Sequence, residues 1–295
     1  MRGWFVCAPG PCYARCMAGS TLIRQLLDPV TSPPPDAWLW PCIFAGALVT
    51  LGGVMLIARM LRAFGSPVGS LPPQIGLMAI GLGLGVMVLP PLIVDPMQNP
   101  MLGGAVTLLV SVAAFVLLAI TQSAGPEAPQ WLRVKPRDLA RAFALWLVLL
   151  PTLVACVLAS VAGVRLAGYE VAPQPQIEEL TRGSGPLWVA GWFALAGVAV
   201  PLAEELIFRL ALFGALAGWL ARGKGWRDPG RLAALAASIA LFVAAHGDWV
   251  IGIVPLCVLA WALTGLFAHS CSLWPCVLVH GLHNSLVVAL QFWLR

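Results

Sequence analysis

Charged residues are scarce in this sequence. Asp, Glu, Lys and Arg make up 10% of the 295 residues, and the mean hydropathy is +0.90. A soluble domain carries about 25% charged residues, so the composition excludes a water-soluble globular fold. Instead, apolar runs of about 18 or more residues recur along the chain, and each is long enough to cross a hydrocarbon layer of roughly 30 Å as a helix. The sequence therefore predicts a polytopic membrane protein.

Three further patterns are missing. The apolar runs do not alternate with polar residues over about ten positions, as the strands of a transmembrane barrel would. The sequence has no basic patch interleaved with aromatic residues, which would indicate a nucleic-acid surface. In a membrane protein, the excess positive charge behind the net charge of +5 usually lies in cytoplasmic loops. The eight cysteines contain no CxxC pair, which argues against a structural zinc site. We expect an all-α bundle that contacts the lipid bilayer and no nucleic acid.

Eight stretches are long enough to be transmembrane helices. The fifth is too long for one straight crossing and contains Pro201, which predicts a kink or a break just before Glu204 and Glu205. Residues 1–36 end in SPPPD and should form an extended lead-in, within which Met17 is an alternative start. The eight predicted spans are 37–58, 75–94, 101–122, 139–164, 186–221, 231–248, 250–268 and 274–293.

The distribution of basic residues predicts the orientation. Short loops rich in Lys and Arg face the cytoplasm, and three such loops follow the first, third and fifth spans. The alternate loops, which contain Asp95, Glu170 and Asp248, should face outside together with both termini. The residues that mark the three basic loops are Arg59, Arg62, Arg133, Lys135, Arg137, Arg141, Arg222, Lys224, Arg227 and Arg231.

Ionisable side chains inside predicted spans gather in the C-terminal half of the chain. Such residues cost several kcal/mol in a bilayer unless they are paired or line a wet cavity, so they are functional candidates. The second, third and seventh spans have none in their interiors. The polar residues of the cluster are Glu204, Glu205, Arg209, His246, His280, His283 and Asn284.

Helix geometry separates the two glutamates. Glu205 and Arg209 are four residues apart, in the order that favours an ion pair on one helix face. Glu204 points about 100° away and is free to face a cavity as a general base. Phe242 and His246 are also four apart, as are His280 and Asn284, so each pair shares a face.

The depths of these residues in the bilayer are compatible with one site. Counted from the cytoplasmic ends of their helices, Glu204, His246 and His280 lie about 27, 22 and 15 Å deep, with Asn284 at about 21 Å. A carboxylate, imidazoles and an amide at such depths can activate water and stabilise an oxyanion, which is the chemistry of peptide hydrolysis. Zinc bound by Glu204, His246 and His280 is the alternative, although the HExxH motif of helical zinc proteases is absent.

In this order, EELIFR, FVAAH and HGLHN resemble the motifs of the CPBP family of intramembrane CAAX prenyl proteases and their bacterial relatives. The resemblance covers roughly residues 186–293. It implies a glutamic-type endopeptidase in which Glu204 and His246 activate water, and His280 and Asn284 stabilise the oxyanion. Glu205, Arg209 and Phe242 then support the site, with no cofactor required. The chain divides into the lead-in over 1–36, N-terminal transmembrane helices over 37–164 and a CPBP-like catalytic core over 165–295.

The resemblance implies that the substrate is a membrane protein or lipoprotein cleaved near its C-terminus, in a bacterial cytoplasmic membrane. Lipidated proteins and proteins with a sorting signal, as for the myxosortase type, are both included. Two other functions stay open: a transporter or channel with an intramembrane proton relay, and a non-catalytic immunity or scaffold protein with the same fold.

Several residues near the motifs have simpler interpretations. Phe242 by itself is typical of core packing, and the Glu205–Arg209 pair by itself is compatible with a purely structural role. His283 competes with His280, but the motif spacing favours His280. His269 is expected in a loop or interface, and Asp248 outside the site.

Overall fold

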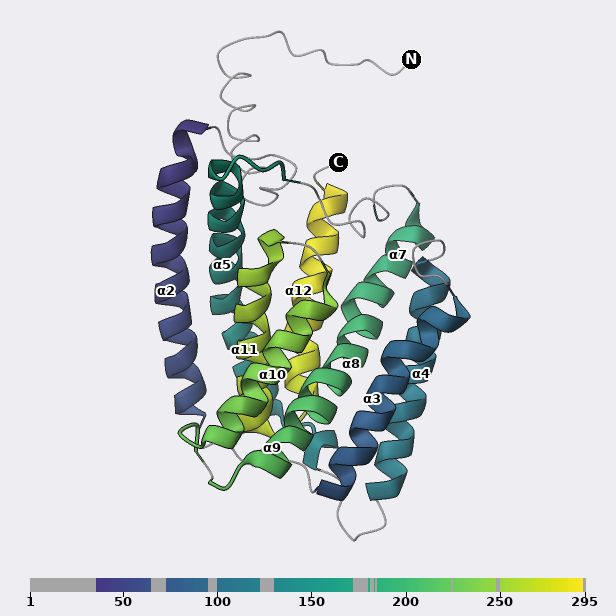
Figure 1. The fold of residues 1–295 in the computed structure, drawn as a ribbon. Helices are drawn as coiled ribbons and strands as arrows, with labels where there is room; N and C mark the ends of the chain where they lie inside the picture. The colour runs from purple at the N-terminus through teal and green to yellow at the C-terminus, as the bar shows by residue number, and fades with distance from the viewer. Residues whose placement is uncertain are drawn as a thin grey trace, which may run out of the picture.

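The computed structural model of the chain describes residues 36–64, 73–94, 100–122, 130–171, 180, 183, 185–223, 225–247 and 250–293. Every element within these ranges is helical, which confirms the all-α prediction (Figure 1). The main helices are α2 (Leu39–Ala63), α3 (Pro73–Ile93), α4 (Pro100–Gln122), α5 (Pro136–Leu166), α7 (Pro186–Ala194), α8 (Val200–Glu204), α9 (Ala215–Leu220), α10 (Pro229–Ala245), α11 (Ile253–Ser270) and α12 (Trp274–Trp293). Two π-helical segments, η3 (Leu195–Ala199) and η4 (Glu205–Gly214), and three short 3₁₀ turns, η1 (Asp36–Trp38), η2 (Gln130–Leu132) and η5 (Val250–Gly252), complete the elements.

Each of the eight predicted spans coincides with a helix or a continuous helical series. Six of these are long and apolar enough to cross a membrane. The exceptions are α10, which has 17 residues, and the apolar stretch Gly76–Pro90 within α3. The structure thus supports a multi-pass membrane protein, with α10 shorter than the sequence predicted. The extended lead-in lies almost wholly outside the described residues, as do Asp95, Lys224 and Asp248.

The helices form one bundle in which the long series from α7 to α9 runs obliquely (Figure 1). On one side of the bundle α2 packs along α5, and on the other α3 and α4 pack against the α7–α9 series. Between them lie α10, α11 and α12. A single buried core joins residues from both the N-terminal and the C-terminal region, among them Ile57, Leu118, Leu149, Leu206 and Leu263.

Of the kink or break predicted before the glutamates, the break is absent from the structure. The backbone stays helical through Val200 (φ −64°, ψ −50°), and the series Pro186–Leu220 is continuous. In a regular α-helix the ring of Pro201 would clash with the carbonyl of residue 197. The wider π-helical turn of η3, which contains Gly197, accommodates the proline instead. This widening leaves carbonyl groups available for partners on another helix.

The crossing of η3 and α12 depends on two glycines. A Cβ atom added to Gly281 would lie against the Gly197 carbonyl oxygen, well inside van der Waals contact. A Cβ atom on Gly197 would meet the Ser285 hydroxyl in the same way. Small residues permit such close approach of membrane helices. Because His280 precedes Gly281 directly, this crossing brings His280 towards the glutamates.

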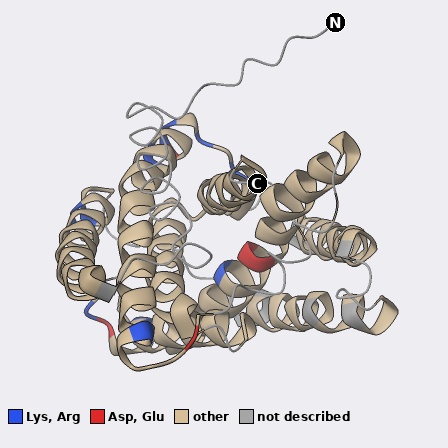
Figure 2. Ribbon diagram, turned by 90° about the horizontal axis from the view of Figure 1, so that it is seen from above, with Lys and Arg blue, Asp and Glu red and all other residues tan. Residues whose placement is uncertain are grey.

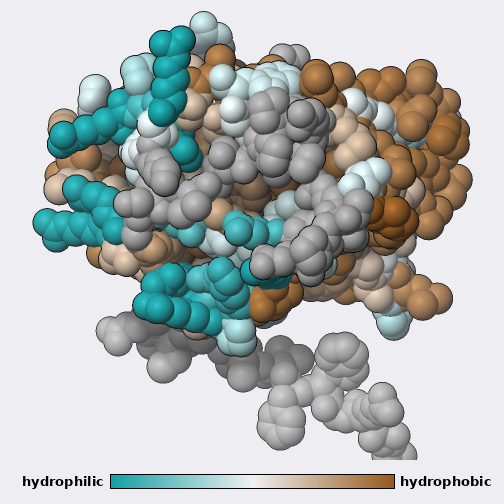
Figure 3. All heavy atoms as spheres, turned by 90° about the horizontal axis from the view of Figure 1, so that it is seen from below, coloured by the Kyte–Doolittle hydropathy of each residue, from teal (hydrophilic) through white to brown (hydrophobic). Residues whose placement is uncertain are grey.

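The described residues of the three basic loops lie at one end of the bundle, as predicted, whereas Arg165 lies at the opposite end of α5. The Arg141 guanidinium carbon lies 5.0 Å from the centre of the Phe64 ring, which joins the end of α2 to the start of α5. Figure 3 shows hydrophilic atoms gathered on this face, with hydrophobic atoms around much of its edge. Both the start of α2 and the end of α12 lie at the opposite end (Figure 1). The arrangement agrees with a cytoplasmic placement of this basic end.

Asp228 builds the turn between α9 and α10 at the basic end. Its carboxylate accepts backbone N–H bonds from Arg231 (3.0 Å), Gly223 (2.6 Å) and Arg222 (2.9 Å). Asp228 is thus the N-cap of α10, followed by Pro229 at the first helical position. The hydrogen bond from the Arg231 N–H, with those from the other amides, lowers the pKa of the Asp228 carboxyl.

The glycine crossing can be tested with Gly281→Ala. The added methyl group must push α12 away from the Gly197 backbone, so we expect the thermal unfolding midpoint in detergent to fall by roughly 5 °C. Gly163→Ala is the matched control, because Gly163 also lies in a helix and a Cβ there meets nothing within 4 Å. An unchanged or raised midpoint for Gly281→Ala would show that the crossing tolerates a side chain.

Candidate active site

Three helical segments bring the predicted polar residues together. Glu204 ends α8, Glu205 and Arg209 lie in η4, and α12 carries His280. Viewed along the bundle, an acidic and a basic segment lie side by side among the helices, while most other charged segments lie at the edges (Figure 2). The residues of the site therefore meet inside the bundle rather than at its charged end.

Glu205 and Arg209 form the ion pair that their spacing predicts. Arg209 Nε lies 3.0 Å from Glu205 Oε2, and both side chains are fully buried. The two atoms are at ion-pair distance but lack hydrogen-bond alignment, and among the described residues the three guanidinium nitrogens have no hydrogen-bond acceptor. A buried charge is tolerated only with an opposite charge beside it, so each residue requires the other.

His280 lies between the two glutamates. Its Nδ1 atom is 2.7 Å from Glu205 Oε1 and its Nε2 atom is 3.5 Å from Glu204 Oε2. A carboxylate oxygen accepts, so the Nδ1–H group donates to Glu205 and fixes the ring. His280 thus couples the buried ion pair to Glu204.

Glu204 is the member of this group that reaches open space. Its side chain is 21% exposed, whereas those of Glu205 and Arg209 are inaccessible. The Oε2 atom is buried and, among the described residues, has no hydrogen-bond partner, because the His280 nitrogen is too distant. One face of the carboxylate is therefore held by the protein and the other is available to water or a substrate.

The water-activating pair of Glu204 and His246 that the resemblance implied stays a prediction. In the described part of the chain His246 makes no direct ion pair with Glu204. It caps the end of α10, where its Nδ1 atom lies 2.7 Å from the Phe242 carbonyl oxygen. Since a carbonyl only accepts, Nδ1 carries the hydrogen and Nε2 of the neutral ring is left as an acceptor. His280 instead faces Glu204. The motif spacing could not distinguish the two histidines, because both occur four residues from their motif partners.

Asn284 uses one amide N–H group to join α12 to the π-helical turn. Its Nδ2 atom donates to the Ala196 carbonyl oxygen at 3.1 Å. The amide is thus a contact between helices in this state, in addition to any role towards an oxyanion. The sequence contained a signal for this contact, since Pro201 disturbs the carbonyls of the preceding turn. The link from that turn to Asn284 was missed.

The remaining predicted neighbours take separate places. The Nδ1 atom of His283 is buried and lacks a hydrogen-bond partner among the residues that the structure describes. His269 lies in the last turn of α11 at the basic end, where its Nε2 atom accepts from the Trp226 indole at 3.3 Å. Ser238 was not singled out, yet its hydroxyl donates to the Phe208 carbonyl of η4 at 2.9 Å. That bond ties α10 to the π-helical segment.

The zinc alternative does not fit this geometry. Within the described part of the chain, no three His, Cys, Asp or Glu side chains are placed to hold a metal ion. Glu204 and His280 face each other, but the Nδ1 atom of His246 is bonded to a backbone carbonyl.

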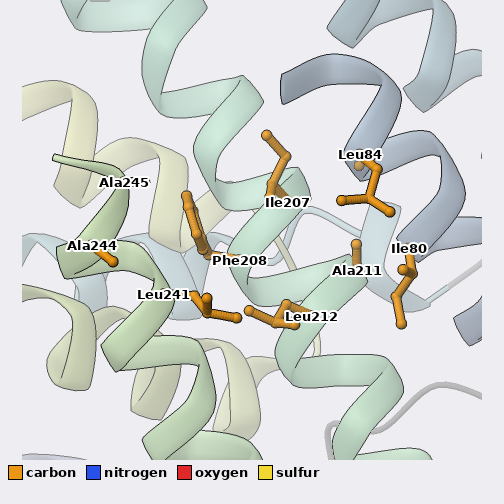
Figure 4. Close-up of a pocket in the computed structure, with 10 residues that line it drawn as sticks. Ile80, Leu84, Ile207, Phe208, Ala211, Leu212, Leu241, Ala244 and Ala245 are labelled. Carbon is orange, nitrogen blue, oxygen red and sulfur yellow. The ribbon is translucent and has the colours of Figure 1, made fainter. Parts of the chain in front are cut away.

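An apolar groove adjoins the site between α3, η4 and α10 (Figure 4). The groove, with a volume of about 290 Å³, reaches Ala245, the neighbour of His246, and Phe208, which packs on Phe242. Leu84 and Leu241 are more than half exposed, so the groove opens towards the lipid. We call this the α3–α10 groove; its lining residues are Ile80, Gly83, Leu84, Ile207, Phe208, Ala211, Leu212, Leu241, Ala244 and Ala245.

The buried ion pair can be tested by removing its cation. Arg209→Met leaves the Glu205 carboxylate buried beside an apolar chain, so we expect a loss of about 3–5 kcal/mol in the free energy of unfolding. Adding Glu205→Gln should recover part of this loss. Arg227→Met, at an exposed position of the basic end, is the control and should change little. Thermal unfolding in detergent measures all three, and equal effects of Arg209→Met and Arg227→Met would contradict the assignment.

Comparison with known proteins gives one match. The family model described as type II CAAX prenyl endopeptidase Rce1-like matches residues 186–286. The match runs from the start of α7 into α12 and includes all three motifs of the site. No curated protein and no solved structure matches the chain. The resemblance predicted from the sequence is thereby confirmed: residues 186–286 of this multi-pass membrane protein are similar to the Rce1-like type II CAAX prenyl endopeptidases.

Proposed function

We propose that the protein is an intramembrane endopeptidase that hydrolyses a peptide bond near the C-terminus of a membrane-associated protein. The observation that supports this most directly is the state of Glu204. Its side chain is partly exposed within a membrane bundle. Behind it, His280 contacts Glu204, Glu205 contacts His280, and Arg209 contacts Glu205. A carboxylate with one open face and a fixed imidazole behind it is arranged to take a proton from water.

In the proposed reaction Glu204 accepts a proton from a water molecule as the water oxygen attacks the peptide carbonyl carbon. The carbonyl oxygen becomes an oxyanion, and the carbon becomes tetrahedral. Transfer of the proton from Glu204 to the amide nitrogen then allows the C–N bond to break, which leaves a carboxylic acid and an amine. The Nε2 side of His280 faces Glu204, and Glu205 holds the His280 ring in place.

The oxyanion needs hydrogen-bond donors, and the candidate donors already bond to other groups of the protein when no substrate is bound. His280 Nδ1 donates to Glu205, and the Asn284 amide donates to Ala196. Either residue can stabilise the oxyanion only through another atom. For Asn284 this is the second amide N–H group, and for His280 it is Nε2. Catalytic hydrogen bonds often tighten only when the substrate is bound, so this adjustment is ordinary for a free enzyme.

The α3–α10 groove supports a substrate that approaches from the bilayer. Its lining is wholly apolar, and it lies beside the proposed reaction site. An apolar segment or lipid anchor next to the scissile bond could occupy it without leaving the hydrocarbon layer. We therefore propose that the substrate is anchored in the membrane near the bond that is cleaved.

Replacing Glu204 tests the proposed chemistry. Glu204→Gln keeps the shape of the side chain but cannot accept the proton, so the cleavage rate should fall about 10²–10⁴-fold. C-terminal masses of membrane and exported proteins should be compared in cells with the wild type, with this variant and without the protein. The variant should match the cells without the protein, while its thermal unfolding stays near that of wild type. Full cleavage of the substrate by a folded Glu204→Gln protein would contradict the proposal.

Filling the groove tests the route of the substrate. Ala244 lies on the outward side of α10 and lines the groove, so Ala244→Trp should raise KM for the substrate found above by about tenfold, with a smaller change in kcat. Ala233→Trp is the control, since Ala233 is exposed on the same helix and outside the groove. Identical kinetics for the two variants would show that the substrate arrives elsewhere.

A further inference from the structure

The buried guanidinium of Arg209 has fewer polar partners than a fully buried cation normally requires. Its side chain has no exposed area, and the carboxylate of Glu205 is its ion-pair partner. None of its three guanidinium nitrogens has a hydrogen-bond partner among the described residues. A guanidinium carries five N–H donors, so the ion pair alone does not account for a stable position in the middle of the bundle.

The ring of Phe242 supplies the missing contact. The guanidinium carbon of Arg209 lies 4.5 Å from the centre of this ring, which is within the range of a cation–π interaction. Phe242 itself is fully buried, so water does not weaken the attraction. The Phe208 ring meets it nearly edge-on, with centroids 5.1 Å apart and planes at 82°, which holds the ring in orientation.

Phe242 also contacts both histidines of the site. Its carbonyl oxygen accepts the His246 Nδ1–H bond, and the two rings lie 4.5 Å apart. On another side the His280 ring lies 6.1 Å away at 62°. One side chain therefore touches Arg209 and both imidazoles, and it connects α10 with η4 and α12.

We propose that Phe242 is a positioning residue whose aromatic face, rather than its volume, holds the Arg209 guanidinium beside Glu205. Through Glu205 this contact fixes His280, and through His280 it fixes Glu204. The negative face of the ring takes the place of a second acidic partner, which would add a charge to the group. The part of this inference that concerns turnover rests on the proposed peptidase function, whereas the part that concerns Arg209 does not.

The test is a series of fluorinated phenylalanines at position 242, with one, two and three ring fluorines. Fluorine withdraws electron density from the ring face and changes its shape very little, so a cation–π contact weakens stepwise. The same series at position 213 is the control. Phe213 is also fully buried in η4, and its ring contacts are Trp226 and Phe267 rather than a cation.

We expect the unfolding midpoint to fall with each fluorine at position 242 and to stay nearly level at position 213. In the Arg209→Met background the series at position 242 should also become level. For the wild-type Arg209 enzyme, kcat should fall by about tenfold across the series while KM is nearly constant.

Two results would overturn the inference. Equal slopes of the unfolding midpoint at positions 242 and 213 would show that packing accounts for Phe242. A slope at position 242 that persists in Arg209→Met would show that the ring acts on something other than this cation. If the wild type cleaves nothing, the peptidase proposal fails, while the midpoints still decide whether the ring holds Arg209.

Discussion

The buried ion pair between Glu205 and Arg209 is the interaction on which the rest of the site depends. Both charges lie inside a transmembrane bundle with no exposed area, where either one alone would be strongly unfavourable. Together they give His280 a fixed acceptor, and His280 gives Glu204 a fixed neighbour. The order of these contacts runs from the most buried group to the most exposed. A single carboxylate is thereby presented to a space where chemistry can occur, while the supporting charges stay out of reach.

A second constraint comes from backbone geometry rather than charge. Pro201 is accommodated by the wide turn of η3, and that turn offers the Ala196 carbonyl to Asn284. At the same crossing Gly197 and Gly281 let the two backbones meet closely. Without this approach α12 could not carry His280 to both glutamates. The proline and the two glycines therefore act on the site although none of them has a reactive side chain.

The sequence predicted the helices, the group of polar residues and the pair of Glu205 with Arg209, but not which histidine faces Glu204. Long apolar runs mark membrane helices strongly, so all eight appeared close to their observed bounds, and the spacing of Glu205 and Arg209 predicted their contact. Which histidine faces Glu204 depends on how α10 and α12 are rotated and translated in the bundle, and one helix's periodicity contains no such information. The π-helical turns were missed for a related reason: the proline predicted a disturbance of the helix, but not that it takes the form of a wider turn packed against α12.

The shortness of α10 has a consequence for how His246 is held. Its 17 residues rise at most about 26 Å, which is less than the roughly 30 Å of a hydrocarbon layer. The last carbonyls of a helix lack intrahelical donors, and lipid cannot provide them. The Phe242 carbonyl accepts from the His246 ring at 2.7 Å, and the Val243 and Ala244 carbonyls accept from the backbone N–H groups of His246 and Gly247 at 3.1 and 3.2 Å. The end of α10 thus closes its own carbonyl groups without help from the lipid, and His246 is held at this position by both its ring and its backbone.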